Sequence, residues 1–196
     1  MGYPAPPWAM QGQLWLSLFR VRGVEGRPDG VYGAAFVSYE PGSELTYSEL
    51  LVARRVAQPE RAVSITDIWV DSPESMEGGR ELWAIPKGLC DFTTETRRQG
   101  PLSRTEVAAA ITGEPIARAR FSDVSRLAPR LPFRGGTWQP PLDGGEEPKT
   151  ARLHGSARSL PCRARWDFAV DGPLGWLAGR RALASFRMSD FRMTFG

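Results

Sequence analysis

Short apolar runs separated by Gly and Pro dominate the pattern of this chain. Residues 14–21 form one dense apolar run, and residues 63–70 mostly alternate apolar and polar side chains, as half-buried strands do. The sequence Thr112-Gly113-Glu114 predicts a hairpin turn. Further strand-like segments cover residues 31–39, 45–56, 105–111, 115–121, 150–160, 163–170 and 182–195. The pattern therefore predicts a mainly β protein, α+β with few short helices.

Helical signals are few. Ser72 suits a helix cap, Pro73 suits the first helical position, and Gly78-Gly79 favours an early end, so residues 72–79 predict one short turn of helix. Residues 121–127 predict a second. Residues 134–148 contain Gly-Gly twice and Pro-Pro once, which is typical of a lid-like loop. The simplest architecture is a curved antiparallel sheet, closed or nearly closed around a pocket.

Length and composition predict one globular domain spanning residues 1–196. The chain is 41% hydrophobic and 24% charged, and 196 residues are enough for one proper core. No stretch approaches the roughly 20 apolar residues that span a bilayer, which predicts no membrane partner. Residues 1–7 have neither a basic patch nor an apolar run, so we expect no signal peptide and a cytoplasmic location.

Several functional classes are disfavoured. The net charge of +3 comes from residues spread along the chain, and no nucleic-acid-binding motif is present, so a solvated basic surface is expected rather than a nucleic-acid partner. Cys90, Cys162 and the single histidine, His154, do not form a cluster with ligand spacing, which predicts no metal. We expect His154 to be an ordinary strand residue and both thiols to be reduced.

Lysine is rare in this chain. Of the 25 Lys and Arg residues, only Lys87 and Lys149 are lysines. An arginine cannot act as a nucleophilic amine, so the two lysines are candidates for that role, unless their choice is an accident of coding. Lys87 follows the apolar residues 82–85. Burial there would lower its pKa and release the free amine, whereas a surface position would leave it an ordinary snorkelling residue.

The segment around Lys87 resembles the acetoacetate decarboxylase-like family. The residues that carry the resemblance are Gly79-Arg80-Glu81 followed by Pro86-Lys87, preceded by Tyr47-Ser48-Glu49. The two ends of the chain, residues 3–8 and 190–196, also resemble those of family members. The similarity therefore touches the whole chain.

This resemblance implies a closed, cone-like double β-barrel around an apolar pocket. It implies that Lys87 forms a Schiff base with a keto substrate, with Glu49 in the same pocket as an acid/base or orienting group. It implies no cofactor, since the lysine supplies the electron sink, and it implies a homo-oligomer. Trp83 and Arg80 are expected beside the substrate, although Arg80 also suits a purely structural role at the Lys87 turn.

The sequence departs from the decarboxylase pattern in three places. Gly88 follows Lys87 where the decarboxylases have a second lysine, so burial alone would have to lower the amine pKa. The carboxylate-binding arginine of the family aligns with Gln13, which would bind substrate without a charged fork. A second pocket carboxylate would fall near Ala34 or Ala35. These changes disfavour acetoacetate itself.

Two functions remain. The first is a lyase acting on a larger keto compound through a Lys87 imine, by decarboxylation or by aldol, dehydration or cyclisation chemistry. The second is a small-molecule-binding or shape-templating barrel that uses Glu49 and leaves Lys87 unreactive. Trapping an imine with borohydride would distinguish them.

Overall fold

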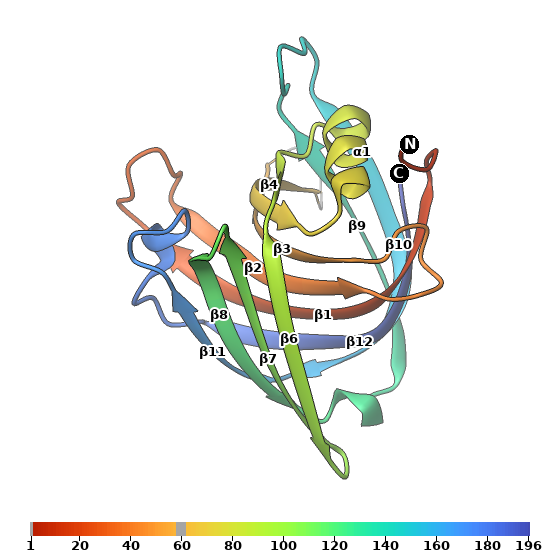
Figure 1. Ribbon diagram of the computed structural model, residues 1–196, viewed down its shortest axis with the longest axis vertical. Helices are drawn as coiled ribbons and strands as arrows, with labels where there is room; N and C mark the ends of the chain where they lie inside the picture. Colours follow the sequence, from red (N-terminus) through yellow and green to blue (C-terminus); the bar gives the residue numbers. More distant parts are fainter. Residues whose placement is uncertain (1, 58–61) are drawn as a thin grey trace.

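A computed structural model describes residues 2–57 and 62–196, and their fold is mainly β (Figure 1). Within them lie one α-helix, α1 (Pro73–Trp83), and two 3-10 turns, η1 (Ser125–Leu127) and η2 (Gly175–Leu177). The strands are β1 (Trp8–Val21), β2 (Gly30–Tyr39), β3 (Tyr47–Arg55), β4 (Ala62–Val70), β5 (Lys87–Leu89), β6 (Asp91–Gln99), β7 (Leu102–Ile111), β8 (Glu114–Asp123), β9 (Arg130–Gln139), β10 (Lys149–Pro161), β11 (Arg163–Phe168) and β12 (Ala184–Phe195).

Seven strands close into a barrel. Their order is β3-β2-β1-β12-β10-β9-β4, and the ring closes because β4 also pairs with β3. All of these pairings are antiparallel except the short parallel contact between β4 and β9. Strand β5 adds to β4 in parallel and brings Lys87 opposite Ile68. The expected closed β-barrel is confirmed.

A second sheet, ordered β11-β8-β7-β6, lies against the outside of the barrel (Figure 1). Strands β1, β2 and β3 therefore bury both faces, and alternate residues enter two different cores. On β1, Trp15 and Phe19 pack against the second sheet, while Leu14 and Leu16 face the barrel interior. This explains the dense apolar runs of these strands, which a sheet with one wet face would not need.

The helix α1 is longer than the sequence suggested. Ser72 caps its first turn as expected, accepting a hydrogen bond from the backbone N–H of Ser75 at 3.1 Å. The expectation that Gly78-Gly79 ends the helix is wrong: it continues to Trp83. A Cβ at Gly78 would lie within 3 Å of Tyr3 and Trp8, so this glycine permits close packing inside the helix.

Other differences also have local causes. The expected loop at 134–148 is confined to residues 140–148, because residues 134–139 belong to β9. Gly136 lies in that strand, where a Cβ would come within 2.7 Å of the Ala151 carbonyl oxygen of β10. The polar edge strand β6 was missed. Among the described residues, no helix is long and apolar enough to cross a membrane.

Candidate active site

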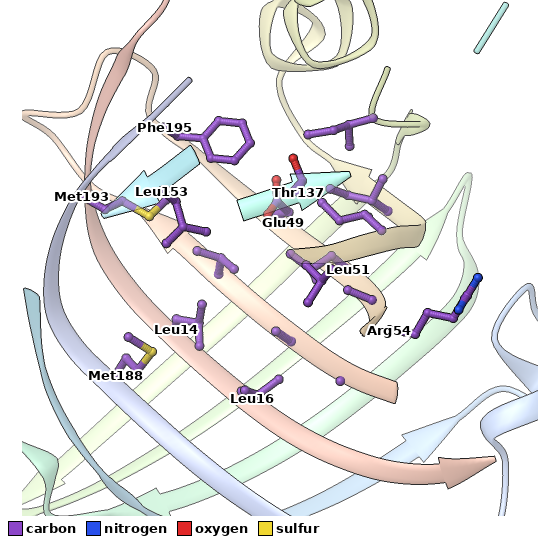
Figure 2. A pocket seen from close by; sticks show the side chains of 18 of the residues that line it. Leu14, Leu16, Glu49, Leu51, Arg54, Thr137, Leu153, Met188, Met193 and Phe195 are labelled. Carbon is purple, nitrogen blue, oxygen red and sulfur yellow. The ribbon is translucent and has the colours of Figure 1, made fainter. Parts of the chain in front are cut away.

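The barrel encloses a cavity of about 690 Å³ with mostly apolar walls (Figure 2). Leucine, isoleucine, valine and methionine side chains from β1, β3, β4, β10 and β12 make up much of the lining. The polar side chains that reach it are few: Tyr39, Tyr47, Glu49, Lys87 and Thr137, with Asp29, Arg54 and Arg55 at one end. Concave, apolar sites with a few converging polar groups are typical of small-molecule binding.

Lys87 lies buried among polar groups in this wall. Its Nζ atom is 3.2 Å from Glu49 Oε2, and it donates hydrogen bonds to Ser75 Oγ at 2.9 Å and Tyr47 OH at 3.3 Å. Tyr39 OH donates to the other oxygen of Glu49, Oε1, at 3.4 Å. Lys87 and Glu49 are each only 4% exposed. The amine and carboxylate therefore form a fully buried ion pair facing the cavity.

A helix end sets the position of Lys87. Helix α1 stops where Ala84 takes a left-handed conformation, and the N–H groups of Ala84 and Ile85 bond back to the carbonyls of Arg80 and Gly79. Pro86 cannot continue a helix, so the chain turns at once into β5, which begins with Lys87. The residues between the Gly-Arg-Glu and Pro-Lys elements are therefore those that form the last turn of α1 and its C-terminal cap.

Gly79 leaves room for the lysine side chain. A Cβ at this position would lie 2.7 Å from Cδ and 2.8 Å from Cε of Lys87. A hydrogen in place of a side chain is therefore required for Lys87 to run past the helix toward Glu49. Arg80, the next residue, donates to the Lys87 carbonyl oxygen at 3.1 Å.

The electrostatics of Lys87 differ from the expectation. Burial lowers its pKa, as predicted from its apolar flanks, but Tyr47 and Glu49 raise it, and the net direction is upward. The expected net lowering is therefore wrong. The physical reason is the counter-ion at 3.2 Å, which favours the ammonium form in a site of low dielectric constant. Burial also raises the pKa of the Tyr47 hydroxyl, which keeps this neighbour neutral at ordinary pH.

Some site residues were not found from the sequence. Tyr39, Ser75 and Thr137 carry no local signal, since they come from β2, α1 and β9 and meet only in the closed barrel. The Thr137 hydroxyl is buried and lacks a hydrogen-bond partner within the described structure. A buried polar atom without a partner is uncommon in proteins, and here it borders the cavity (Figure 2). No cluster of three or more His, Cys, Asp or Glu suited to a metal occurs among the described residues.

Of the three predicted substrate-binding residues, one lies in the cavity wall and two do not. Trp83 lines the cavity, but Gln13 and Arg80 do not. Gln13 alternates with the cavity-facing Leu14 on β1 and points outward, where its Oε1 accepts a hydrogen bond from Arg187 at 2.7 Å. Arg80 donates hydrogen bonds from Nε and Nη2 to the Asp143 carboxylate at the surface. The predicted substrate contacts of Gln13 and Arg80 are therefore not supported, because neither residue belongs to the cavity lining.

The other positions that depart from the decarboxylase pattern also differ in whether they face the cavity. Ala35 lines the cavity, whereas Ala34 packs in the core beneath the second sheet. Gly88 faces Trp69, whose Cδ1 atom would lie 3.2 Å from an added Cβ. Successive strand residues point to opposite faces, so a lysine at this position would project away from Lys87.

The chain is similar to known proteins in both sequence and fold. The model of the acetoacetate decarboxylase family matches residues 24–139. No curated protein sequence matches the chain significantly. Among solved structures, the enduracididine biosynthesis enzyme MppR with bound HEPES buffer superposes with a TM-score of 0.67 at 16% identity, over 98% of this chain and 86% of that one.

Two further structures show the same fold. An acetoacetate decarboxylase from Legionella pneumophila gives a TM-score of 0.66 at 14% identity, covering 99% of this chain and 86% of its own. An acetoacetate decarboxylase-like enzyme from Sphingomonas wittichii RW1 gives 0.59 at 16% identity, covering 97% of this chain and 91% of its own. At these identities the structural likeness concerns the fold.

Proposed function

This chain belongs to the acetoacetate decarboxylase family, and from that premise we propose that it is a lyase that holds a keto substrate as an imine of Lys87. The observation that carries the proposal is the buried pair of Lys87 and Glu49 facing an apolar cavity. These are the amine and carboxylate that imine chemistry requires, and both are shielded from water.

The chemistry begins with a proton transfer. Lys87 rests as an ammonium beside Glu49, so the amine becomes nucleophilic when its proton moves to the carboxylate at 3.2 Å. The amine then attacks the substrate carbonyl to give a carbinolamine. Glu49 returns the proton to the departing hydroxyl, which leaves as water, and a protonated imine remains. That cation accepts the electron pair released by loss of carbon dioxide or of an α-proton.

Neighbouring hydroxyls support these steps. Ser75 and Tyr47 both accept hydrogen bonds from Nζ, which holds the amine beside the cavity as its charge changes. Tyr39 donates to Glu49 and fixes the carboxylate. Thr137, whose hydroxyl has no hydrogen-bond partner among the described residues, can donate a hydrogen bond to a substrate oxygen.

One observation favours a second candidate. Because Glu49 raises the pKa of Lys87, the ammonium can act as a fixed cation that binds an anionic ligand without covalent chemistry. The barrel would then bind a small molecule or template its reaction by shape, with Glu49 as the acid/base and Lys87 unreactive.

Borohydride reduction in the presence of keto compounds distinguishes the two. We expect a reduced adduct on Lys87, detected by peptide mass spectrometry, and none in Lys87→Met or Lys87→Arg. Lys149→Met is the matched control, because it removes the other lysine, whose Nζ donates to the Glu81 carbonyl and which is not part of the cavity lining. Tight binding without any adduct would refute the imine and support the second candidate.

A further inference from the structure

We propose that the substrate is an elongated keto compound with a long apolar chain and an anionic group at its far end. This inference rests on the proposed function, since it assigns the carbonyl to Lys87, and it names the class of molecule that fills the rest of the cavity. It depends on a taper in the wall formed by β1, β2 and β3.

The taper follows from the register of the three strands. Moving away from Lys87, the inward residues of β2 become steadily smaller: Tyr39, Val37, Ala35 and Gly33. On the neighbouring strands, Leu14 and Glu49 lie opposite Val37, Leu16 and Leu51 opposite Ala35, and Leu18 and Ala53 opposite Gly33. Shrinking side chains in the middle strand leave an apolar channel along β2, bordered by leucines. At Gly33 the channel is narrowed by Leu16 and Leu18, whose methyl carbons would lie 3.0 and 3.6 Å from an added Cβ.

The channel leads from a buried end to an open one. Glu49 and Lys87 are almost fully buried, whereas Val31 at the other end is 41% exposed. Arg54 and Arg55, at the end of β3, belong to the lining at this opening. Figure 2 shows Arg54 there. From Glu49 to these arginines is five or six strand residues, about 16 to 20 Å. The cavity therefore suits a chain rather than a compact acid such as acetoacetate.

Charge at the opening indicates what the far end of the substrate carries. Among the described residues of the lining, two arginines stand there against one carboxylate, Asp29. None of the ion pairs among the described residues involves Arg54 or Arg55. Guanidinium groups bind carboxylates and phosphates through paired hydrogen bonds. A carboxylate at the end of the chain supplies the matching charge.

The test uses straight-chain methyl ketones of increasing length, in two series that end in a methyl group or a carboxylate. Binding is measured by calorimetry, and imine formation by borohydride trapping. Affinity should rise about fourfold for each added methylene until the channel is full. The carboxylate series should gain a further advantage only at lengths that reach the opening, and Arg54→Met/Arg55→Met should remove it.

Blocking variants locate the channel. In Ala35→Leu the affinity should stop rising with ketone length at a short chain. In Gly33→Leu, which lies farther from Lys87, it should stop rising at a longer chain. Ala108→Leu, on the outer sheet away from the cavity, is the control of equal size and should match wild type. Circular dichroism and thermal unfolding check each fold, and Ala35→Val replaces any variant that unfolds.

The outcomes separate the two proposals. Adducts with short ketones but no dependence of affinity on chain length would overturn the channel and leave the imine standing. Length-dependent binding without any adduct would refute the imine and retain the channel. Wild-type length dependence in both Ala35→Leu and Gly33→Leu would also overturn the channel, and equal affinity for both termini at every length would overturn the anionic far end.

Discussion

Replacing Gly79 by alanine tests whether this glycine exists for the sake of Lys87. The new Cβ would lie 2.7 Å from Cδ and 2.8 Å from Cε of the lysine, well inside contact distance. Backbone cannot yield easily in the middle of α1. The lysine can, because its side chain borders the cavity.

The expected magnitudes follow from the contacts. Overpacking a buried site costs about 1–3 kcal/mol, and alanine favours a helix over glycine by about 1 kcal/mol, so the free energy of unfolding should fall by no more than about 2 kcal/mol. Ordinary contact begins at 3.4 Å, so the lysine side chain would have to move by about 0.7 Å, which would lengthen or misalign the 3.2 Å contact between its amine and Glu49. A misplacement of about 1 Å can cost on the order of 10²-fold in rate. Gly79→Ala should therefore lose far more activity than stability.

Gly78→Ala is the matched control. Its Cβ would meet Tyr3 at 2.7 Å and Trp8 at 2.8 Å, with none of its three nearest contacts on Lys87. We expect it to lose stability in urea unfolding while keeping most of the borohydride trapping rate. Equal trapping rates in Gly79→Ala and wild type, with the helix intact, would show that the lysine tolerates the added methyl group and that our reading of Gly79 is wrong.

Four further predictions concern the cavity and the thiols. Glu49→Gln removes a charge that raises the Lys87 pKa, whereas burial still lowers it, so the pH profile of borohydride trapping should move to lower pH. An unchanged profile would refute the electrostatic coupling between Glu49 and Lys87. Thr137→Val should leave stability unchanged or higher, because the hydroxyl has no partner in the described structure, but should raise KM in steady-state kinetics; an unchanged KM would exclude a substrate contact. Acetoacetate should be turned over poorly, measured as carbon dioxide release, and rates matching true decarboxylases would contradict this. Burial raises the pKa of Cys90 and Cys162 to about 12, so iodoacetamide should label both slowly until urea is added, and rapid native labelling would contradict it.

Much of the fold could be predicted from the sequence because three of its strands, β1, β2 and β3, bury both faces. Apolar runs such as residues 14–21 and 31–39 mark β1 and β2 without ambiguity. Strand β6 is largely exposed at a sheet edge, so its polar sequence resembles a loop. In α1 the glycines resemble a stop signal, although their role is close packing against Lys87 and two aromatic rings.

The candidate site was only partly predictable. The short elements around Lys87 and Glu49 are local in sequence, and both residues lie where the resemblance implied, facing one cavity. Gln13 was misplaced because the alignment took no account of strand alternation, in which Leu14 faces inward and Gln13 cannot. Thr137 could not be found, since only the parallel pairing of β9 with β4 closes that wall, and no local pattern encodes it.

Because β1, β2 and β3 are buried on both faces, substrate specificity and stability depend on different side chains of the same strands. On β1, Leu14, Leu16 and Leu18 border the cavity, whereas Trp15 and Phe19 fasten the barrel to the outer sheet. Substitutions at the even positions can therefore accumulate during evolution, or be randomised in a library, with little effect on the second core. A selection for new substrates should concentrate on these positions and leave their odd-numbered neighbours untouched.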